Sequence, residues 1–216
     1  MGNLDLVTVI VIAANVLFSM KGFNDHSFFE KYKFNTGAVR RGEQIRLLTS
    51  GFLHVNTAHL FFNMLTLYFF AAIVVGLLGT VNFLIIYLGS LILGNLLSFY
   101  FHKDEYNYTA VGASGAVSGI LYSAILLQPG MSLYMFFIPI PIPAYIFGIG
   151  YLLYSIYGMR AQNDNIGHDA HFGGAIGGYV ITLAMAPVLF QTNLLMVSLL
   201  AIPIIILFIL NKTGKL

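Results

Sequence analysis

The stretch VGASGAVSG, which covers Val111–Gly119, holds two serines and three glycines. It lies in a chain of 216 residues that is 58% hydrophobic and only 8% charged. A soluble domain carries about 25% charged residues, so this chain has too few to cover a water-facing surface. Its solvent must be lipid, and hydroxyl groups at membrane depth usually face a bundle interior or a water-filled cavity.

Seven apolar segments surround or contain this stretch. A helix that crosses the hydrocarbon needs roughly 20 mainly apolar residues, and the expected spans are residues 4–20, 59–78, 80–101, 113–128, 133–157, 171–190 and 194–210. We expect the first to be a retained helix, since it lacks the basic start of a signal peptide. The fold class predicted is all-α, a polytopic membrane helix bundle forming one domain over residues 1–216.

The connection at 21–58 is much longer than the others. It mixes basic and acidic residues with apolar runs, which favours a structured loop half-embedded in the membrane interface over a plain linker. The formal net charge of +2 is too small to suggest a nucleic-acid partner, and the absence of cysteine excludes disulfides and thiolate chemistry.

Polar residues gather at the starts of the second, fourth and sixth spans. His59 and Asn63 are four residues apart, hence on one helix face; Ser114 opens the fourth span, and His168 and His171 open the sixth. Because the chain reverses direction at each crossing, these three starts lie on one side of the membrane. A hydroxyl becomes a nucleophile when a neighbouring imidazole takes its proton, and nearby N–H donors stabilise the resulting oxyanion.

Each feature also has a simpler interpretation. Small residues four apart, such as Gly115 with Gly119 and Gly174 with Gly178, are common packing seams in membranes. A single serine in an apolar helix usually bonds its own backbone, and an asparagine often bonds a neighbouring helix. Four histidines could instead bind a metal: His54, His59, His168 and His171.

Four motifs together resemble the rhomboid family of intramembrane serine proteases. GASGAVSG is similar to the family's GxSGxxxG motif, AHFGGAIGG to AHxxGxxxG, HLFFNM to HxxxN, and EQIR in the long loop to ExWR. Their order and spacing agree over roughly residues 21–187. The resemblance implies a core of six helices, to which the span at 194–210 adds a seventh.

The resemblance also implies roles for individual residues. Ser114 would be the nucleophile and His171 the general base of a dyad. His59 and Asn63 would line the oxyanion hole with the backbone N–H of Ser114. Structural roles would fall to Gly112 in the loop, to a helix contact of Gly115 and Gly119 with Gly174 and Gly178, and to the loop anchors Glu43 and Arg46.

Two positions depart from the family pattern. Ile45 stands where the family often has Trp, so anchoring of the loop through an indole is absent. Ser118 stands where the family often has an aromatic residue that stacks on the catalytic imidazole. His168 matches no catalytic position of the family, which leaves it as a polar residue at the mouth of the span.

The implied activity is hydrolysis of peptide bonds in or near the transmembrane helices of membrane-protein substrates, with no metal or organic cofactor. The partners expected are those substrates and the lipid bilayer, with no assignment of oligomeric state. Two alternatives are a catalytically inactive rhomboid-like protein that binds membrane clients, and a small transporter with polar helix mouths.

The orientation in the membrane receives two conflicting indications. Alternation of the spans puts all ten lysines and arginines on the side of Ser114, and the positive-inside rule would make that side cytoplasmic. The family resemblance implies an active site that opens away from the cytoplasm. We follow the resemblance and expect an integral protein of the bacterial inner membrane.

Overall fold

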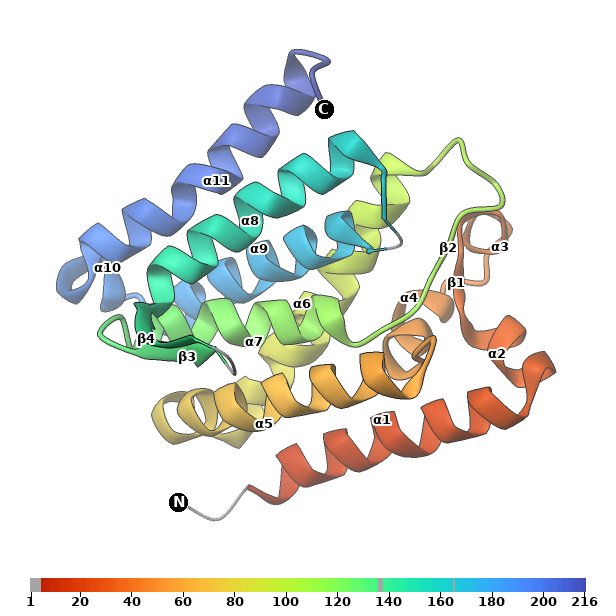
Figure 1. Ribbon diagram of the computed structural model, residues 1–216, viewed down its shortest axis with the longest axis horizontal. Helices are drawn as coiled ribbons and strands as arrows, with labels where there is room; N and C mark the ends of the chain where they lie inside the picture. The colour runs from red at the N-terminus through yellow and green to blue at the C-terminus, as the bar shows by residue number, and fades with distance from the viewer. Residues whose placement is uncertain (1–4, 136–137, 165) are drawn as a thin grey trace.

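The computed structural model describes residues 5–135, 138–164 and 166–216, and within them the architecture is a bundle of long helices (Figure 1). The long helices are α1 (Leu6–Asn24), α5 (Thr57–Leu78), α6 (Thr80–Phe101), α7 (Ser114–Leu127), α8 (Ala144–Ala161), α9 (His168–Met185) and α11 (Leu194–Lys212). The prediction of an all-α membrane bundle is confirmed. Four of these helices, α1, α5, α6 and α11, are long and apolar enough to cross a membrane.

The helix α7 lies at the centre of the bundle. It has 14 residues, the fewest of the long helices, and every one of its residues from Gly115 to Leu126 is buried. Figure 1 shows α1 and α5 on one side of it and α8 and α11 on the other, with α6 and α9 packed beside it. The helix that begins at Ser114 is therefore shielded from lipid by its neighbours.

The long connection between α1 and α5 is structured, as expected. It contains α2 (His26–Tyr32), β1 (Phe34–Asn35), α3 (Thr36–Arg40), α4 (Arg46–Thr49) and the 3₁₀ turn η1 (Ser50–Phe52). β1 pairs antiparallel with β2 (Thr109–Ala110), so that Phe34 lies opposite Ala110. This short ladder ties the long connection to the segment that leads into Ser114.

The predicted span at 133–157 is wrong before Ala144. An antiparallel hairpin of β3 (Ser132–Met135) and β4 (Ile138–Pro143) precedes α8. Pro139, Pro141 and Pro143 alternate with isoleucines, and proline in a helix interior removes a backbone donor and clashes with the preceding turn. Hydropathy alone gave no weight to this pattern.

Several other boundaries shift by a few residues, and α8 continues to Ala161. The predicted start of the first span at residue 4 lies outside the described residues, and α1 continues to Asn24. The span expected at 171–190 is observed as α9, which begins at His168 and ends at Met185, followed by the short α10 (Leu189–Thr192). The helix therefore begins one turn before His171.

Glycines bring α7 and α9 into backbone contact. A Cβ placed on Gly174 would lie 1.9 Å from the carbonyl oxygen of Gly115, and one on Gly178 would lie 2.0 Å from that of Gly119. Real Cβ atoms do not approach so closely, and these carbonyl oxygens belong to the backbone, which no rotamer change can move. The two helices can be this close only because these positions carry no side chain.

Contacts between connections define the two ends of the bundle. At one end, Thr80 donates to Asp5 at 3.0 Å, which places the start of α1 beside the turn between α5 and α6. At the other end, Arg40 of α3 donates to the carbonyl oxygen of Lys103 at 2.7 Å. Ser114 and His171 belong to this second end, together with the segments that carry all ten lysines and arginines.

Candidate active site

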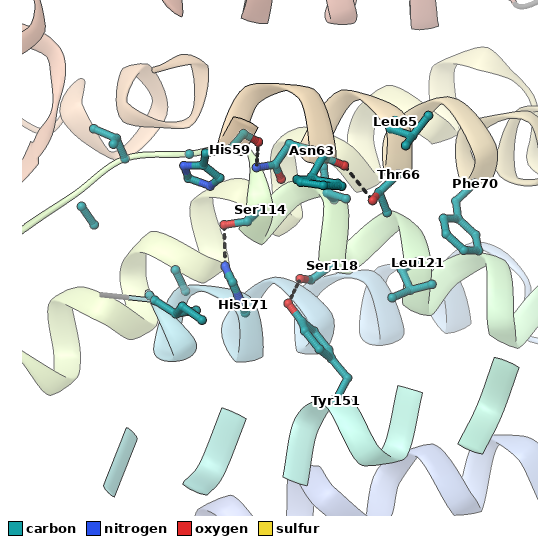
Figure 2. Close-up of a pocket in the computed structure, with 18 of the residues that line it drawn as sticks. His59, Asn63, Leu65, Thr66, Phe70, Ser114, Ser118, Leu121, Tyr151 and His171 are labelled. Atoms are coloured by element: carbon teal, nitrogen blue, oxygen red, sulfur yellow. Dashed lines mark hydrogen bonds between the residues drawn. The ribbon is translucent and has the colours of Figure 1, made fainter. Parts of the chain in front are cut away.

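Ser114 and His171 meet at the starts of their two helices. Ser114 is the first residue of α7 and His171 lies in the first turn of α9. The Nε2 atom of His171 lies 2.6 Å from Ser114 Oγ, the contact drawn in Figure 2. With the neutral imidazole protonated on Nδ1, Nε2 accepts from the serine hydroxyl, which is the arrangement that activates a hydroxyl for attack.

The segment before Ser114 has a backbone that favours glycine. Gly112 has φ +132°, and a Cβ there would lie 2.7 Å from Cε1 of His59 and 3.6 Å from Ser114 Oγ. Because it has no side chain, Gly112 lets the His59 ring come close to Ser114. Separately, the first N–H groups of a helix have no intrahelical partners, so those at the start of α7 can donate to an anion.

His59 and Asn63 both lie on α5 above Ser114, as Figure 2 shows. Asn63 is 7% exposed, and its Nδ2 donates to the carbonyl oxygen of His59 at 3.0 Å, leaving the second N–H of that amide for another acceptor. The two residues therefore share the cavity with the Ser114–His171 pair.

His54 is a residue whose role the sequence did not indicate. The backbone N–H of Ala113 donates to His54 Nε2 at 3.3 Å, and Nδ1 lies 2.8 Å from Ser19 Oγ. Burial lowers the pKa of His54 to about 3, with His59 acting in the same direction. The ring is therefore neutral and accepts through Nε2, which holds the segment that leads into Ser114. The one feature of the sequence that could have indicated a role for His54 is its position five residues before His59.

The aromatic residue missing at position 118 is supplied by α8. The Tyr151 ring stacks on His171, with centroids 5.9 Å apart and planes inclined by 19°. Its hydroxyl lies 3.0 Å from Ser118 Oγ, also drawn in Figure 2. The serine at position 118 leaves room for this ring and hydrogen-bonds it. The sequence could not identify Tyr151, because the contact joins helices that are far apart in the chain.

Glu43 and Arg46 hold the long connection together. Arg46 Nε donates to Glu43 Oε2 at 2.7 Å, and its Nη1 donates at 2.8 Å to the carbonyl oxygens of Glu30 and Lys33. Ile45, at the position of the family's Trp, is 59% exposed. Anchoring here depends on the guanidinium rather than on position 45.

His168 is buried against α8. Its Nε2 lies 3.1 Å from both carboxylate oxygens of Asp164, and Gly158 provides the space for its ring. Its interpretation as a polar residue at the mouth of the span was incomplete, because the ring joins α9 to the end of α8. In the described part of the chain, no three His, Cys, Asp or Glu side chains gather as metal ligands.

A cavity of about 1500 Å³ opens beside the Ser114–His171 pair. Its walls come from α5, α7, α8 and β3, and they are mainly aromatic and aliphatic, including Phe62, Phe69, Phe147 and Leu133. Figure 2 shows Leu121 and Phe70 to the right of Ser114 and His171, further along α7 and α5. A cavity of this size with polar groups at one end suits an apolar ligand that presents a polar group to the serine.

Comparisons with known proteins give matches to one family. The model of the Rhomboid domain family matches residues 41–188. The chain is 30% identical over 187 residues to RHOMBOID-like protein 12, mitochondrial, from Arabidopsis thaliana, covering 79% of this chain and 55% of that protein. It is 35% identical over 149 residues to Rhomboid protease GluP from Bacillus subtilis, covering 68% and 27%.

A third relative is Rhomboid protein 1, mitochondrial, from Saccharomyces cerevisiae. The identity is 30% over 138 residues, covering 62% of this chain and 40% of that protein. The chain thus spans about half the length of the Arabidopsis relative and less of the other two.

Proposed function

This chain belongs to the rhomboid family, and we propose that it is a serine endopeptidase that cleaves peptide bonds in or near the transmembrane helices of membrane proteins. The observation that carries the proposal is the 2.6 Å contact between Ser114 Oγ and His171 Nε2 at the end of an apolar cavity. The names of relatives support it, since one of them is called a protease.

The proposed reaction has two steps. Ser114 Oγ attacks the scissile carbonyl carbon while His171 Nε2 takes its proton, and the proton then passes to the leaving amine as the C–N bond breaks. Water next attacks the acyl-serine ester, giving a proton to His171, and the ester bond to Oγ breaks as that proton returns to the serine. The products are a free carboxylate, a free amine and the original enzyme.

In each step, negative charge develops on the carbonyl oxygen and must be stabilised. In our proposal His59, Asn63 and the backbone N–H of Ser114 donate to this oxygen in the tetrahedral intermediate. The neutral His54 keeps the preceding segment in place, because it accepts from the N–H of Ala113. His54 is a positioning residue in this scheme, since it acts through the backbone.

The substrate class follows from the setting of the site. A transmembrane helix hides each carbonyl in a hydrogen bond to the residue four positions on, so a substrate must unwind locally before Ser114 can reach its backbone. Small or helix-breaking residues near the cut site favour this unwinding. The apolar cavity walls suit a segment that arrives from lipid.

The direct test uses purified protein in liposomes. A fluorophosphonate probe should label the wild type at Ser114, and a reconstituted transmembrane substrate should be cut. The Ser114→Ala and His171→Ala proteins should do neither. A client-binding protein without catalysis would retain substrate and resist the probe, so absence of labelling in a folded wild type would reject the proposal.

The membrane and the orientation need their own experiment. The relatives do not favour a bacterial cell membrane over a mitochondrial one, because two of those above are named mitochondrial. We propose that the N-terminus lies in the cytoplasm and that the Ser114 end faces away from it. Single cysteines at Gly2 and Thr213, placed in this cysteine-free chain, distinguish the two faces. A membrane-impermeant maleimide applied to intact cells should label Thr213 only; labelling of Gly2 alone would reverse the orientation.

A further inference from the structure

A second histidine links the two segments that carry Ser114 and His171. His102 directly follows α6, and its ring lies between two carboxylates. Nδ1 is 3.0 Å from Glu105 Oε1 and Nε2 is 3.3 Å from Asp169 Oδ2. The contact with Glu105 is a hydrogen bond and the contact with Asp169 is ionic, so a ring protonated on both nitrogens is attracted to both carboxylates. The geometry therefore fits an imidazolium.

Asp169 depends on this cation. It lies in the first turn of α9, two residues before His171, and is 3% exposed. Its Oδ2 is buried and, in the described part of the chain, has no hydrogen-bond partner; its contact with His102 is ionic. Ser98 and the backbone N–H of Ala170 also favour the ionised carboxyl group, but removal of the positive charge would leave a buried carboxylate without its ion-pair partner, which is unfavourable.

The flat face of the His102 ring packs on the segment that precedes Ser114. The ring stacks on Tyr108, with centroids 3.6 Å apart and planes inclined by 5°. Tyr108 directly precedes β2, and after β2 the chain passes through Gly112 to Ser114. One ring thus contacts the helix of the base on one side and the segment of the nucleophile on the other.

We propose that His102, Asp169 and Tyr108 form an ionic latch that fixes the spacing of Ser114 and His171, and that this latch opens when His102 loses its proton. The inference rests on the proposed function for its effect on turnover. These are positioning residues, since none of them touches the reacting atoms. A displacement of about 1 Å in a reacting group can cost about 100-fold in rate, so a latch of this kind would be felt in catalysis.

The charges around His102 determine the direction of the pH effect. Partial burial lowers the pKa of His102, but the carboxylates of Asp169 and Glu105 outweigh it, so the pKa lies above its ordinary value. From α3, Arg40 instead approaches Asp104 at 3.9 Å and donates to the carbonyl oxygen of Lys103. Because the pKa is higher in the folded chain, the latch contributes fully below about pH 6.5 and is lost as the pH rises through the folded pKa.

The test measures the rate of fluorophosphonate labelling of Ser114 per folded molecule against pH. Wild-type labelling should fall at alkaline pH. His102→Gln and Asp169→Asn should label about 10- to 100-fold more slowly near neutral pH and lack that alkaline fall. His102→Arg, whose guanidinium is planar, can stack on Tyr108 and stays charged, should restore labelling and keep it at alkaline pH.

Two further variants serve as controls. Asp104→Asn changes an exposed carboxylate on the same segment and should behave as wild type. Glu105→Gln removes one of the two carboxylates at His102 and should move the alkaline fall to lower pH. If His102→Gln lowers the melting temperature but keeps the wild-type labelling rate and pH profile, the pair is only structural and the inference is overturned.

A measurement without catalysis separates this inference from the proposed function. In the Ser114→Ala background, thermal stability should fall as the pH rises through the pKa of His102, and Asp169→Asn should remove that dependence. If the wild type is labelled and the His102 variants are labelled at the same rate, only the latch is overturned. A wild type that is never labelled overturns the proposed protease, and the stability measurement then decides whether the latch exists.

Discussion

The helix α9 meets α7 and α8 in two different ways. Against α7 the contact is backbone to backbone, with Gly174 and Gly178 facing Gly115 and Gly119. Against α8 the space is filled by large side chains, among them Tyr151 stacked on His171 and His168 fitted over Gly158. The first boundary sets how closely the backbones of α7 and α9 approach, because backbones cannot adapt. The second orients the imidazole, and side chains there can rearrange.

The dyad gives the largest expected effect, against which both boundaries are judged. Ser114→Ala and His171→Ala should each reduce cleavage by at least about 10³-fold, because each removes a reacting group. Melting temperatures should change little, since neither side chain belongs to the glycine contact. Turnover and thermal unfolding in liposomes check this, and substantial cleavage by both variants would remove the dyad from the mechanism.

The glycine boundary is tested by a single methyl group. Gly174→Ala places a Cβ 1.9 Å from the Gly115 carbonyl oxygen, so the helices must separate, at a cost of about 3 kcal/mol. Activity should fall with stability, because Ser114 moves from His171. Gly150→Ala is the matched control on α8, where a Cβ would meet nothing within 4 Å. Equal stability of the two variants would show that the α7–α9 contact tolerates expansion.

Asn63 lies outside both boundaries, across the cavity on α5. Asn63→Ala should lower turnover by about 100-fold if its free N–H stabilises the oxyanion, and it should do so without moving either boundary. The measurement is turnover per folded molecule, compared with the melting temperature. Loss of stability with unchanged turnover would make Asn63 a structural hydrogen bond to the carbonyl of His59.

Changes at the second boundary, between α8 and α9, should have the smallest effect, and a second substitution should restore activity. Tyr151→Ala should lower turnover by about tenfold through loss of ring orientation, and Tyr151→Phe by less, since only the bond to Ser118 is lost. Adding Ser118→Tyr to Tyr151→Ala supplies a ring from α7 and should recover activity. If turnover by the double variant is no higher than that of Tyr151→Ala, Tyr151 does not act by placing an aromatic ring against His171.

Most of the fold was predictable because lipid imposes a simple constraint on sequence. Spans of apolar residues gave α5 and α6 almost to the residue, and alternation placed Ser114 near His171 at one end of the bundle. The prediction failed at 133–143, where the residues are as apolar as a helix but proline excludes one. Hydropathy measures transfer to lipid and carries no information on backbone donors.

The catalytic candidates were predictable from the sequence, whereas the residues that position them were not. Ser114 and His171 stand in local motifs, in which a few adjacent residues carry the signal. His54, Tyr151 and His102 act through contacts with residues far away in the chain. Such contacts depend on how helices rotate and approach, which periodicity in a single sequence does not specify.

The outer edge of β4 in the β3–β4 hairpin is closed to other strands. Leu133 lies opposite Ile142, and the N–H of Ala144 donates to the carbonyl oxygen of Met131, so the even-numbered residues of β4 direct their N–H groups to β3. The odd-numbered positions on the free edge are Pro139, Pro141 and Pro143, which have no N–H to offer. A further strand pairs only where it finds donors and acceptors in turn. Neither an unwound substrate nor a second copy of the chain can extend this edge over those positions, so an extended peptide must find its ladder elsewhere in the molecule.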